Sequence, residues 1–152
     1  MKAKTLYEAC EQAVEAIELQ PLNYSQEHWA NPIEDIVRFH YMDGCEDAAQ
    51  RAKEACGTAY CRAGHIMCAV KDGPVTAKTA ESGARKLMVD EAKIPIGEVM
   101  RLFGGGAAGP KESYGTEEYV RRGADGLREF MQKYEEQLKS VDLTVDLTAE
   151  LP

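Results

Sequence analysis

The sequence lacks any apolar run approaching 18 residues, the minimum that a membrane-spanning helix needs. Its first residues, MKAKTLYEACEQ, lack the apolar region of a secretion signal. The five cysteines form an odd set without a repeating spacing, so they do not indicate a disulfide framework. These absences predict a cytoplasmic protein that carries reduced thiols and does not associate with a membrane.

Positive charge is also scarce. The chain has 18 Lys and Arg against 26 Asp and Glu, for a net charge of −8. Nucleic-acid binding through a basic face is therefore disfavoured, because phosphate contacts need concentrated Lys and Arg. Acidic residues gather between 27 and 47, where they could meet a basic protein surface or simply form a solvated helix face. The candidates for partner binding in this block are Glu34, Asp35, Asp43, Glu46 and Asp47.

Several motifs of well-known enzyme classes are missing. The chain has no dinucleotide-binding fingerprint, no paired-carboxylate motif and no assembled catalytic triad. The glycine-rich run GGGAAGPKES at 104–113 does not fit a P-loop, because Pro110 precedes Lys111 and a predicted helix, rather than a strand, precedes the run. These absences favour a non-enzymatic function.

The apolar spacing predicts helices along most of the chain. With 44% hydrophobic and 29% charged residues, the 152 residues suit one globular domain. We predict an all-α, single-domain bundle of about six or seven helices around a buried central helix at 58–72. Residues 1–140 form this helical domain, and 141–152 form an acidic tail that is disordered or ordered by a partner. The other predicted helices cover 4–19, 31–44, 45–55, 76–89, a short segment after 94–96, and 116–138.

Helix-capping residues mark three of these helices. Thr5 and Glu8 resemble a capping box, and Thr116 is a suitable N-cap for the last long helix. Asn31 followed by Pro32 predicts an N-cap and a first helical residue. In the helix at 76–89, the predicted inward-facing residues are Ala77, Ala80, Ala84 and Leu87.

The predicted central helix lies in the stretch CGTAYCRAGHIMCAV, residues 56–70. Thr58 is its predicted N-cap and Gly73 its predicted end. Cys61, His65 and Cys68 fall one turn apart and share a face with Gly64. Glycine in a helix interior costs about 1 kcal/mol, so its presence indicates close packing against another backbone.

The same stretch carries a resemblance to a known group of proteins. CGTAYCRAGH, residues 56–65, resembles the pattern C-G-T-x-x-C-x-A-G-[HW] of small, mostly uncharacterised bacterial and phage proteins. Two flanking segments are also similar to that group, and the match spans roughly residues 22–103. The flanking residues are Asn23, Tyr24, Ser25 and Trp29 upstream, and Ala84, Leu87, Arg101, Leu102 and Phe103 downstream.

Two features depart from that pattern. Arg62 stands where an apolar residue is expected, and a long insert separates Trp29 from Cys56. The resemblance implies a helical fold and a bacterial or phage source, and it implies no activity.

Three kinds of site remain open in this stretch. Cys56, Cys61, His65 and Cys68 include the ligand types of a zinc site, although the chain has no C-x2-C pair. Cys61 and His65 could form the thiol–imidazole pair of a thiol enzyme. The helix start at Gly57 and Thr58 could bind a small phosphorylated ligand. The candidate ligand-binding residues are Cys56, Gly57, Thr58, Cys61, Arg62, His65 and Trp29.

Two further patterns concern self-association and the C-terminal residues. In the last long helix, apolar residues repeat at four- and three-residue steps, which suits either a bundle core or a homodimer seam through 120–138. These residues are Val120, Ala124, Leu127, Met131, Tyr134 and Leu138. The tail VDLTVDLTAELP alternates with period two, as an edge strand does.

Together these observations favour a non-enzymatic protein-interaction module without a cofactor. One form of this hypothesis is a phage- or prophage-encoded inhibitor that blocks or sequesters a host component in the host cytoplasm. The alternative is a protein that binds a small phosphorylated ligand or zinc through Cys56–Cys68.

Overall fold

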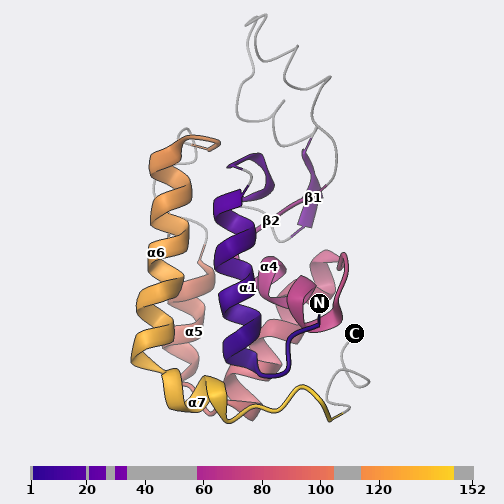
Figure 1. Cartoon of the computed structure of the whole chain (residues 1–152), viewed down its shortest axis with the longest axis vertical. Coiled ribbons are helices and arrows are strands. Elements are labelled where there is room, and N and C mark those ends of the chain that lie inside the picture. The colour runs from indigo at the N-terminus through magenta and orange to yellow at the C-terminus, as the bar shows by residue number, and fades with distance from the viewer. Residues whose placement is uncertain (1, 20, 27–29, 34–57, 105–113, 146–152) are drawn as a thin grey trace, which may run out of the picture.

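The computed structural model describes residues 2–19, 21–26, 30–33, 58–104 and 114–145. In these residues the chain forms one all-α domain with almost no strand, which confirms the predicted fold class (Figure 1). Helices α1, α5 and α6 run along the long axis of the molecule, and α1 packs against both α4 and α6. The elements are α1 (Leu6–Leu19), η1 (Pro21–Asn23), β1 (Ala30–Pro32), β2 (Thr58–Tyr60), α4 (Arg62–Lys71), η2 (Thr79–Gly83), η3 (Lys86–Glu91), α5 (Ile96–Phe103), α6 (Glu117–Lys133) and α7 (Glu135–Lys139).

The N-terminal helix follows its sequence pattern. The Thr5 hydroxyl accepts a hydrogen bond from the Glu8 amide at 3.1 Å, and the Glu8 carboxylate accepts one from the Lys4 amide at 2.7 Å. This arrangement is a capping box in which the carboxylate reaches one residue further back than usual. The helical period of the sequence places Leu6, Cys10, Ala13 and Ile17 on one apolar stripe of α1, and all four are buried in the core.

The predicted start of the central helix at Thr58 is wrong. Residues Thr58–Tyr60 form strand β2, which pairs antiparallel with β1 so that Ala30 lies opposite Tyr60. The central helix, α4, begins at Arg62 with Cys61 as N-cap. Asn31 and Pro32 belong to β1, so the predicted N-cap there is also wrong. The pairing of β1 with β2 overrides the local capping preference of Thr58 and Asn31. A local pattern could not predict this pairing, because the two strands are far apart in sequence.

Helix α4 ends one residue earlier than predicted. Asp72 adopts the left-handed conformation, with φ of 55°, and its amide bonds to the Cys68 carbonyl. The Gly73 amide also bonds to this carbonyl, at 3.0 Å. The left-handed residue that closes the helix is therefore Asp72, a residue type that tolerates this conformation better than most.

The helix predicted at 76–89 contains two wide π-helical stretches, η2 and η3. Ala80, Ala84 and Leu87 are buried as predicted, whereas Ala77 is exposed. Ala77 precedes η2, and a π turn rotates the residues before it relative to those after it. The inward position assigned to Ala77 from an ideal α-helical period is therefore wrong.

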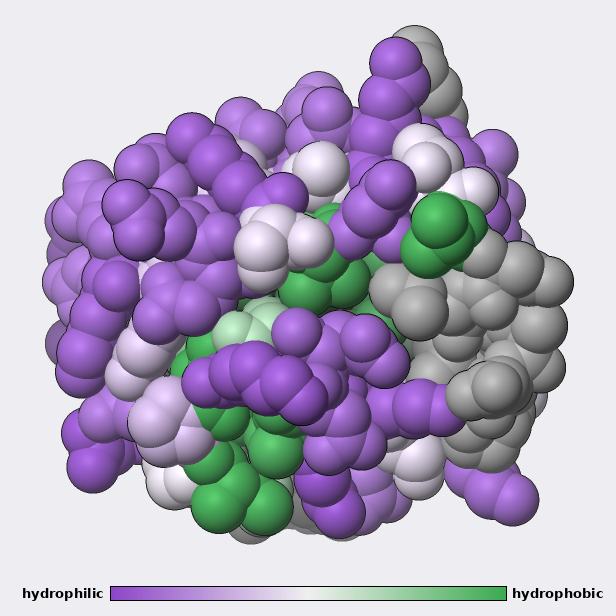
Figure 2. Space-filling view, turned by 90° about the horizontal axis from the view of Figure 1, so that it is seen from below, coloured by the Kyte–Doolittle hydropathy of each residue, from purple (hydrophilic) through white to green (hydrophobic). Residues whose placement is uncertain are grey.

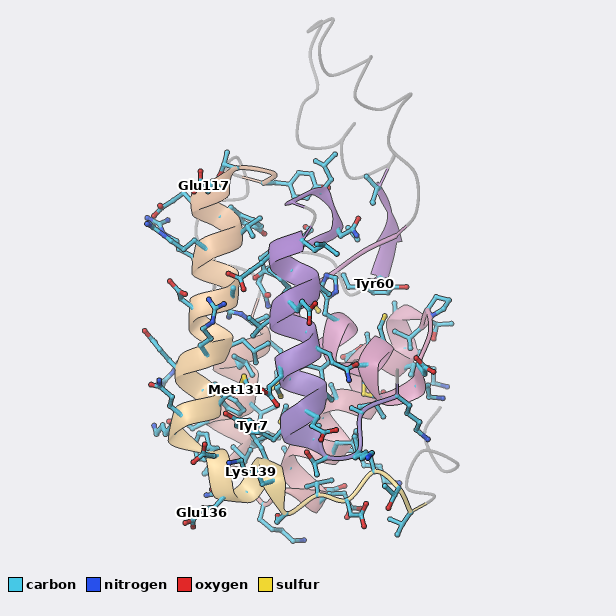
Figure 3. All side chains as sticks on the ribbon, viewed as in Figure 1. Tyr7, Tyr60, Glu117, Met131, Glu136 and Lys139 are labelled. Atoms are coloured by element: carbon cyan, nitrogen blue, oxygen red, sulfur yellow. The ribbon has the colours of Figure 1, made fainter. Side chains whose placement is uncertain are left out.

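The last long helix begins at its predicted cap, since the Thr116 hydroxyl accepts a hydrogen bond from the Tyr119 amide at 3.2 Å. Its regular geometry ends at Tyr134, and α7 continues the chain toward α1. There Lys139 Nζ lies 4.8 Å from the centre of the Tyr7 ring (Figure 3). All six residues of the predicted seam are buried in the core of the single chain. Their side chains are therefore not exposed for a homodimer contact.

Part of the predicted tail belongs to the folded domain. Val141 and Leu143 are buried, and Asp142 forms a single antiparallel bridge with Thr5. The Leu6 amide donates to the Val141 carbonyl at 3.1 Å, and the Leu143 amide donates to the Lys4 carbonyl at 2.8 Å. The boundary predicted at residue 140 thus falls too early, because a partner within the same chain orders 141–143. Residues 146–152 lie outside the described part.

None of the helices in the described ranges is both long enough and apolar enough to span a membrane.

Candidate functional site

A buried hydrogen-bonded cluster holds the loop after α1 against the rest of the helices. We call Tyr24, Gln26, Arg62, His65 and Tyr119 the motif cluster. The Tyr24 hydroxyl donates to Gln26 Oε1 at 2.7 Å, and the Gln26 amide donates to the Tyr119 hydroxyl at 2.7 Å. Gln26 Nε2 donates to the Gly104 carbonyl at 3.1 Å. One short loop is thereby bonded to residues beyond α5 and on α6.

Arg62 joins this cluster from the first position of α4. Its amide donates to Gln26 Oε1 at 3.3 Å. Its side chain is 3% exposed, and the guanidinium donates to three backbone carbonyls. These are the carbonyls of Gly123 (from Nε, 2.9 Å), Leu102 (from Nη1, 2.9 Å) and Arg122 (from Nη2, 3.0 Å). Among the salt bridges between described residues, none involves Arg62, so carbonyl dipoles rather than a carboxylate hold this charge.

Two glycines of α6 make room for the motif cluster. A Cβ atom on Gly123 would lie 2.3 Å from the Tyr24 ring, and a Cβ atom on Gly126 would lie 2.2 Å from Arg62 Nη2. Any larger residue at either position would therefore displace a buried side chain. These glycines, which interrupt the apolar seam in the sequence, form the surface on which Tyr24 and Arg62 pack.

The imidazole of His65 has a structural hydrogen bond. Its Nε2 lies 2.8 Å from the Asn23 carbonyl, which fixes Nε2 as the protonated, donating nitrogen. Burial lowers the pKa of His65 to about 4, with the Asn23 carbonyl acting weakly in the opposite direction. The ring stacks edge-on against Tyr60, with centroids 5.5 Å apart. His65 is therefore neutral at physiological pH.

The thiol of Cys61 is buried at the N-cap of α4. Burial raises the pKa of this thiol to about 11, and the amides of Gly64 and Ala63 only partly offset the shift. The hydrogen bonds of the described residues include none between the Cys61 thiol and the His65 ring. A thiol enzyme needs a thiolate within reach of a basic imidazole, and this arrangement supplies neither.

The other predicted ligands are not gathered into a metal site in the described part. No three His, Cys, Asp or Glu residues there lie close enough to hold an ion. Cys68 is half-buried, and burial raises its pKa. Thr58 lies in β2 rather than at a helix start, so the phosphate site predicted from that start is not formed. Outside the described residues lie Trp29, Cys56 and Gly57, as do the acidic candidates Glu34, Asp35, Asp43, Glu46 and Asp47.

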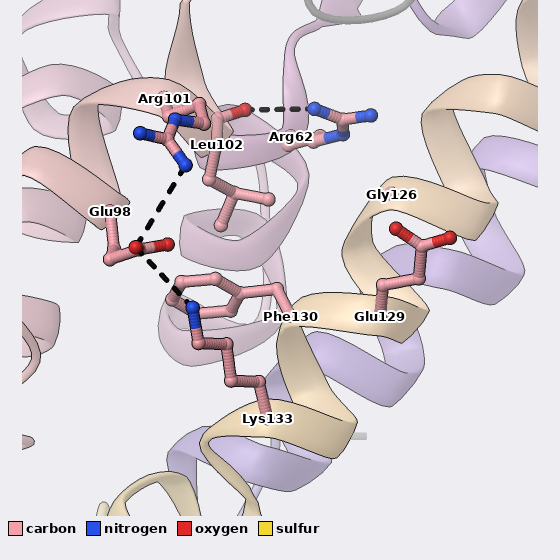
Figure 4. A pocket seen from close by; sticks show the side chains of 8 residues that line it. All are labelled: Arg62, Glu98, Arg101, Leu102, Gly126, Glu129, Phe130 and Lys133. Carbon is pink, nitrogen blue, oxygen red and sulfur yellow. Dashed lines mark hydrogen bonds and ion pairs between the residues drawn. The ribbon is translucent and has the colours of Figure 1, made fainter.

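A cleft between α5 and α6 lies beside Arg62. It has a volume of about 380 Å³, and Arg62 forms its buried end (Figure 4). Glu98 bridges the two walls, because its carboxylate lies 3.3 Å from Lys133 Nζ and 3.9 Å from Arg101 Nη1. The lining residues, which we call the α5–α6 cleft, are Arg62, Glu98, Arg101, Leu102, Gly126, Glu129, Phe130 and Lys133.

Sequence reasoning selected only Arg62 as a site residue among those that line this cleft. The spacing of Glu98 and Arg101, or of Glu129 and Lys133, indicates charges on a common helix face. It does not indicate that α5 and α6 lie next to each other, and that proximity makes the cleft.

No protein-family model, curated protein or solved structure matches the chain. The resemblance to bacterial and phage proteins therefore stays a prediction. Its quoted residues do meet in space: His65 bonds to the Asn23 carbonyl, and Arg62 bonds to the Leu102 carbonyl.

Proposed function

We propose that this protein is a non-enzymatic protein-interaction module that binds its partner through the outer face of α5 and the adjoining α5–α6 cleft. One observation carries the proposal. Ile96 and Met100 lie one helical turn apart on α5 and are 57% and 48% exposed. Ile96 lines the depression between α5 and the η2–η3 segment, and large apolar side chains that are exposed together are a common property of protein-binding surfaces.

The end of the molecule that carries α7 also supports a binding surface. Viewed from that end, hydrophobic side chains form an exposed band between hydrophilic ones (Figure 2). Among the described residues, the large hydrophobic side chains with high exposure are Leu19, Ile96, Met100 and Val145.

The hydrogen bonds of the motif cluster support a binding rather than a catalytic function. The polar atoms of Tyr24 and Gln26 bond within the chain, and the buried imidazole of His65 bonds to a carbonyl. General acid–base or nucleophilic catalysis needs such groups free to reach a substrate. The resemblance to bacterial and phage proteins favours a host protein as the partner, with this chain blocking or sequestering it in the cytoplasm.

Site-specific photocrosslinking tests the proposal. A photoreactive residue at Met100 should capture one defined protein from a bacterial lysate, and excess wild-type protein should compete for that capture. The same group at Glu11, an exposed position on α1, is the matched control and should not capture it. The double variant Ile96→Gln, Met100→Gln should lose binding while its unfolding curve stays unchanged. Equal capture at both positions, or recovery of a small ligand alone, would contradict the proposal.

A further inference from the structure

We infer that the α5–α6 cleft recognises a carboxylate on an acidic segment of the partner, with Arg62 as the buried cation. This inference rests on the proposed function and specifies the chemistry of the partner. It combines the local charge of the cleft, the hydrogen-bonding capacity of Arg62 and the apolar side chains of Leu102 and Phe130 that line the cleft.

The local charge around α5 differs in sign from that of the whole chain. Three cations and two acids line the α5–α6 cleft. On the other side of α5, a second depression contains Arg85 and Lys86 against the single acid Asp90. The chain as a whole carries −8. Complementary charge selects partners and speeds their approach, so the face around α5 favours an acidic partner.

The depression between α1 and α6 provides an internal comparison. Glu11, Glu15 and Glu18 line it against the single cation Arg128. An acidic segment would be repelled there and attracted at α5. The charge therefore distinguishes between two surfaces of the same molecule.

Arg62 has hydrogen-bonding capacity left for a ligand. A guanidinium has five N–H donors, and three of those of Arg62 reach backbone carbonyls in the described part of the chain. One proton on each Nη remains, and the side chain lines both the cleft and the neighbouring depression along α6. Burying a charge without an opposite charge is costly, and a carboxylate from the partner would offset that cost. Two Nη protons also suit the two oxygens of one carboxylate.

The rim of the cleft can rearrange to receive such a group. Arg101 and Lys133 both pair with Glu98, and their side chains are 81% and 60% exposed. Exposed ion pairs of this kind contribute little to stability, so either cation can turn toward an incoming carboxylate. Phe130 and Leu102 supply apolar walls within the cleft. The surface therefore fits a segment that combines acidic and apolar side chains.

Fluorescence anisotropy with two short labelled peptides tests the inference. One probe carries leucine and glutamate at helical spacing, and the other carries glutamine in place of glutamate. The glutamate peptide should bind about tenfold more tightly, because charge-assisted hydrogen bonds are roughly twice as strong as neutral ones. Equal binding of the two peptides would overturn the inference. So would tighter binding of a single-stranded RNA of the same net charge, since the site would then recognise phosphate.

Variants locate the binding energy. Arg62→Lys keeps the positive charge and removes the paired N–H donors. It should therefore weaken binding of the glutamate peptide about tenfold and leave the affinity for the glutamine peptide unchanged. The double variant Arg101→Gln, Lys133→Gln should weaken binding of the glutamate peptide several-fold. This double variant also tests the inference if Arg62→Lys does not fold. Lys71→Gln is the control, because it removes one positive charge at an exposed position outside the cleft, and it should have no effect. Equal losses in the control and in the double variant would overturn the inference.

These results separate the inference from the proposed function. Should Met100 capture a protein while the glutamate peptide fails to bind, the function stands and the acidic partner is wrong. Should the peptide bind through Arg62 while Met100 captures no protein, the carboxylate site stands and the interaction module is wrong.

Discussion

The motif cluster and the α5 face use polar and apolar side chains in opposite ways. In the motif cluster, buried polar atoms bond to one another and to backbone carbonyls, and these bonds fix how α4 and α6 meet. We call Ile96, Met100 and the α5–α6 cleft together the α5 face. There Glu98 forms a partly exposed ion pair with Lys133, and the side chains of Ile96 and Met100 are exposed. Arg62 is common to both regions. The comparison indicates that a distinctive sequence motif can specify architecture, while the surface that we propose for binding lies next to it.

The largest expected effect concerns the pH dependence that His65 gives to the motif cluster. Its pKa is about 4 in the folded chain and 6.5 ordinarily, so the unfolded state binds an extra proton between these values. Stability is therefore unaffected above pH 6.5 and falls by about 3 kcal/mol as the pH drops toward 4. Urea unfolding across this range measures the slope.

His65→Gln is the control for that slope, since glutamine does not titrate. The difference between wild type and variant should appear between pH 6.5 and 4. Parallel curves for the two proteins would show that His65 is not held neutral by burial.

Substituting one glycine in each region with alanine compares how closely the two regions are packed. Gly123→Ala forces a Cβ into the Tyr24 ring and should destabilise the fold by about 2 kcal/mol, even though alanine favours helices. Gly97→Ala on α5 meets nothing within 4 Å and should stabilise it by about 0.5 kcal/mol. Denaturant midpoints measure both changes. A destabilised Gly97→Ala would mean that the α5 face is more closely packed than described.

Tyr119→Phe tests how firmly the loop is held within the motif cluster. The variant leaves the buried Gln26 amide without its acceptor, so it should cost about 1.5 kcal/mol. Amide hydrogen exchange at Gln26 should rise as the loop opens more often. An unchanged exchange rate together with unchanged stability would indicate that this hydrogen bond does not hold the loop.

The smallest expected effect belongs to the α5 face. Ile96→Gln with Met100→Gln alters exposed side chains, so it should change stability by less than about 0.5 kcal/mol. Thermal unfolding measures this change. A large destabilisation would mean that these two side chains support the fold rather than a partner.

The helices could be predicted where local signals agree with packing. The Thr116 cap and the apolar stripe of α1 each depend on residues of a single helix and its cap, and both are present in the structure. The start of α4 could not be predicted, because it depends on the pairing of Tyr60 with the distant Ala30. The π-helical stretches likewise do not follow the α-helical period of apolar residues, so Ala77 is exposed where that period predicts an inward position.

The site was harder to predict than the fold. Arg62 was selected as a ligand-binding candidate because it lies near the predicted helix start, but its sequence position does not reveal that it bonds to the Leu102 and Gly123 carbonyls. Those bonds require α5 and α6 to flank α4, which is a property of the tertiary structure. Gly123 and Gly126 interrupt the apolar seam in the sequence, and their role becomes clear only from the Tyr24 and Arg62 side chains that pack against them.

The bridge between residues 4–6 and 141–143 has a consequence for the order of folding. The Leu6 amide at the first turn of α1 and the Lys4 carbonyl both bond to residues synthesised more than a hundred positions later. During translation, α1 can pack onto α4 early, yet its first turn lacks these partners until Leu143 has left the ribosome. Contacts so distant in sequence slow folding, because the chain must close a long loop to form them. The first turn of α1 is therefore among the first parts of the chain to be synthesised and among the last to gain its hydrogen bonds.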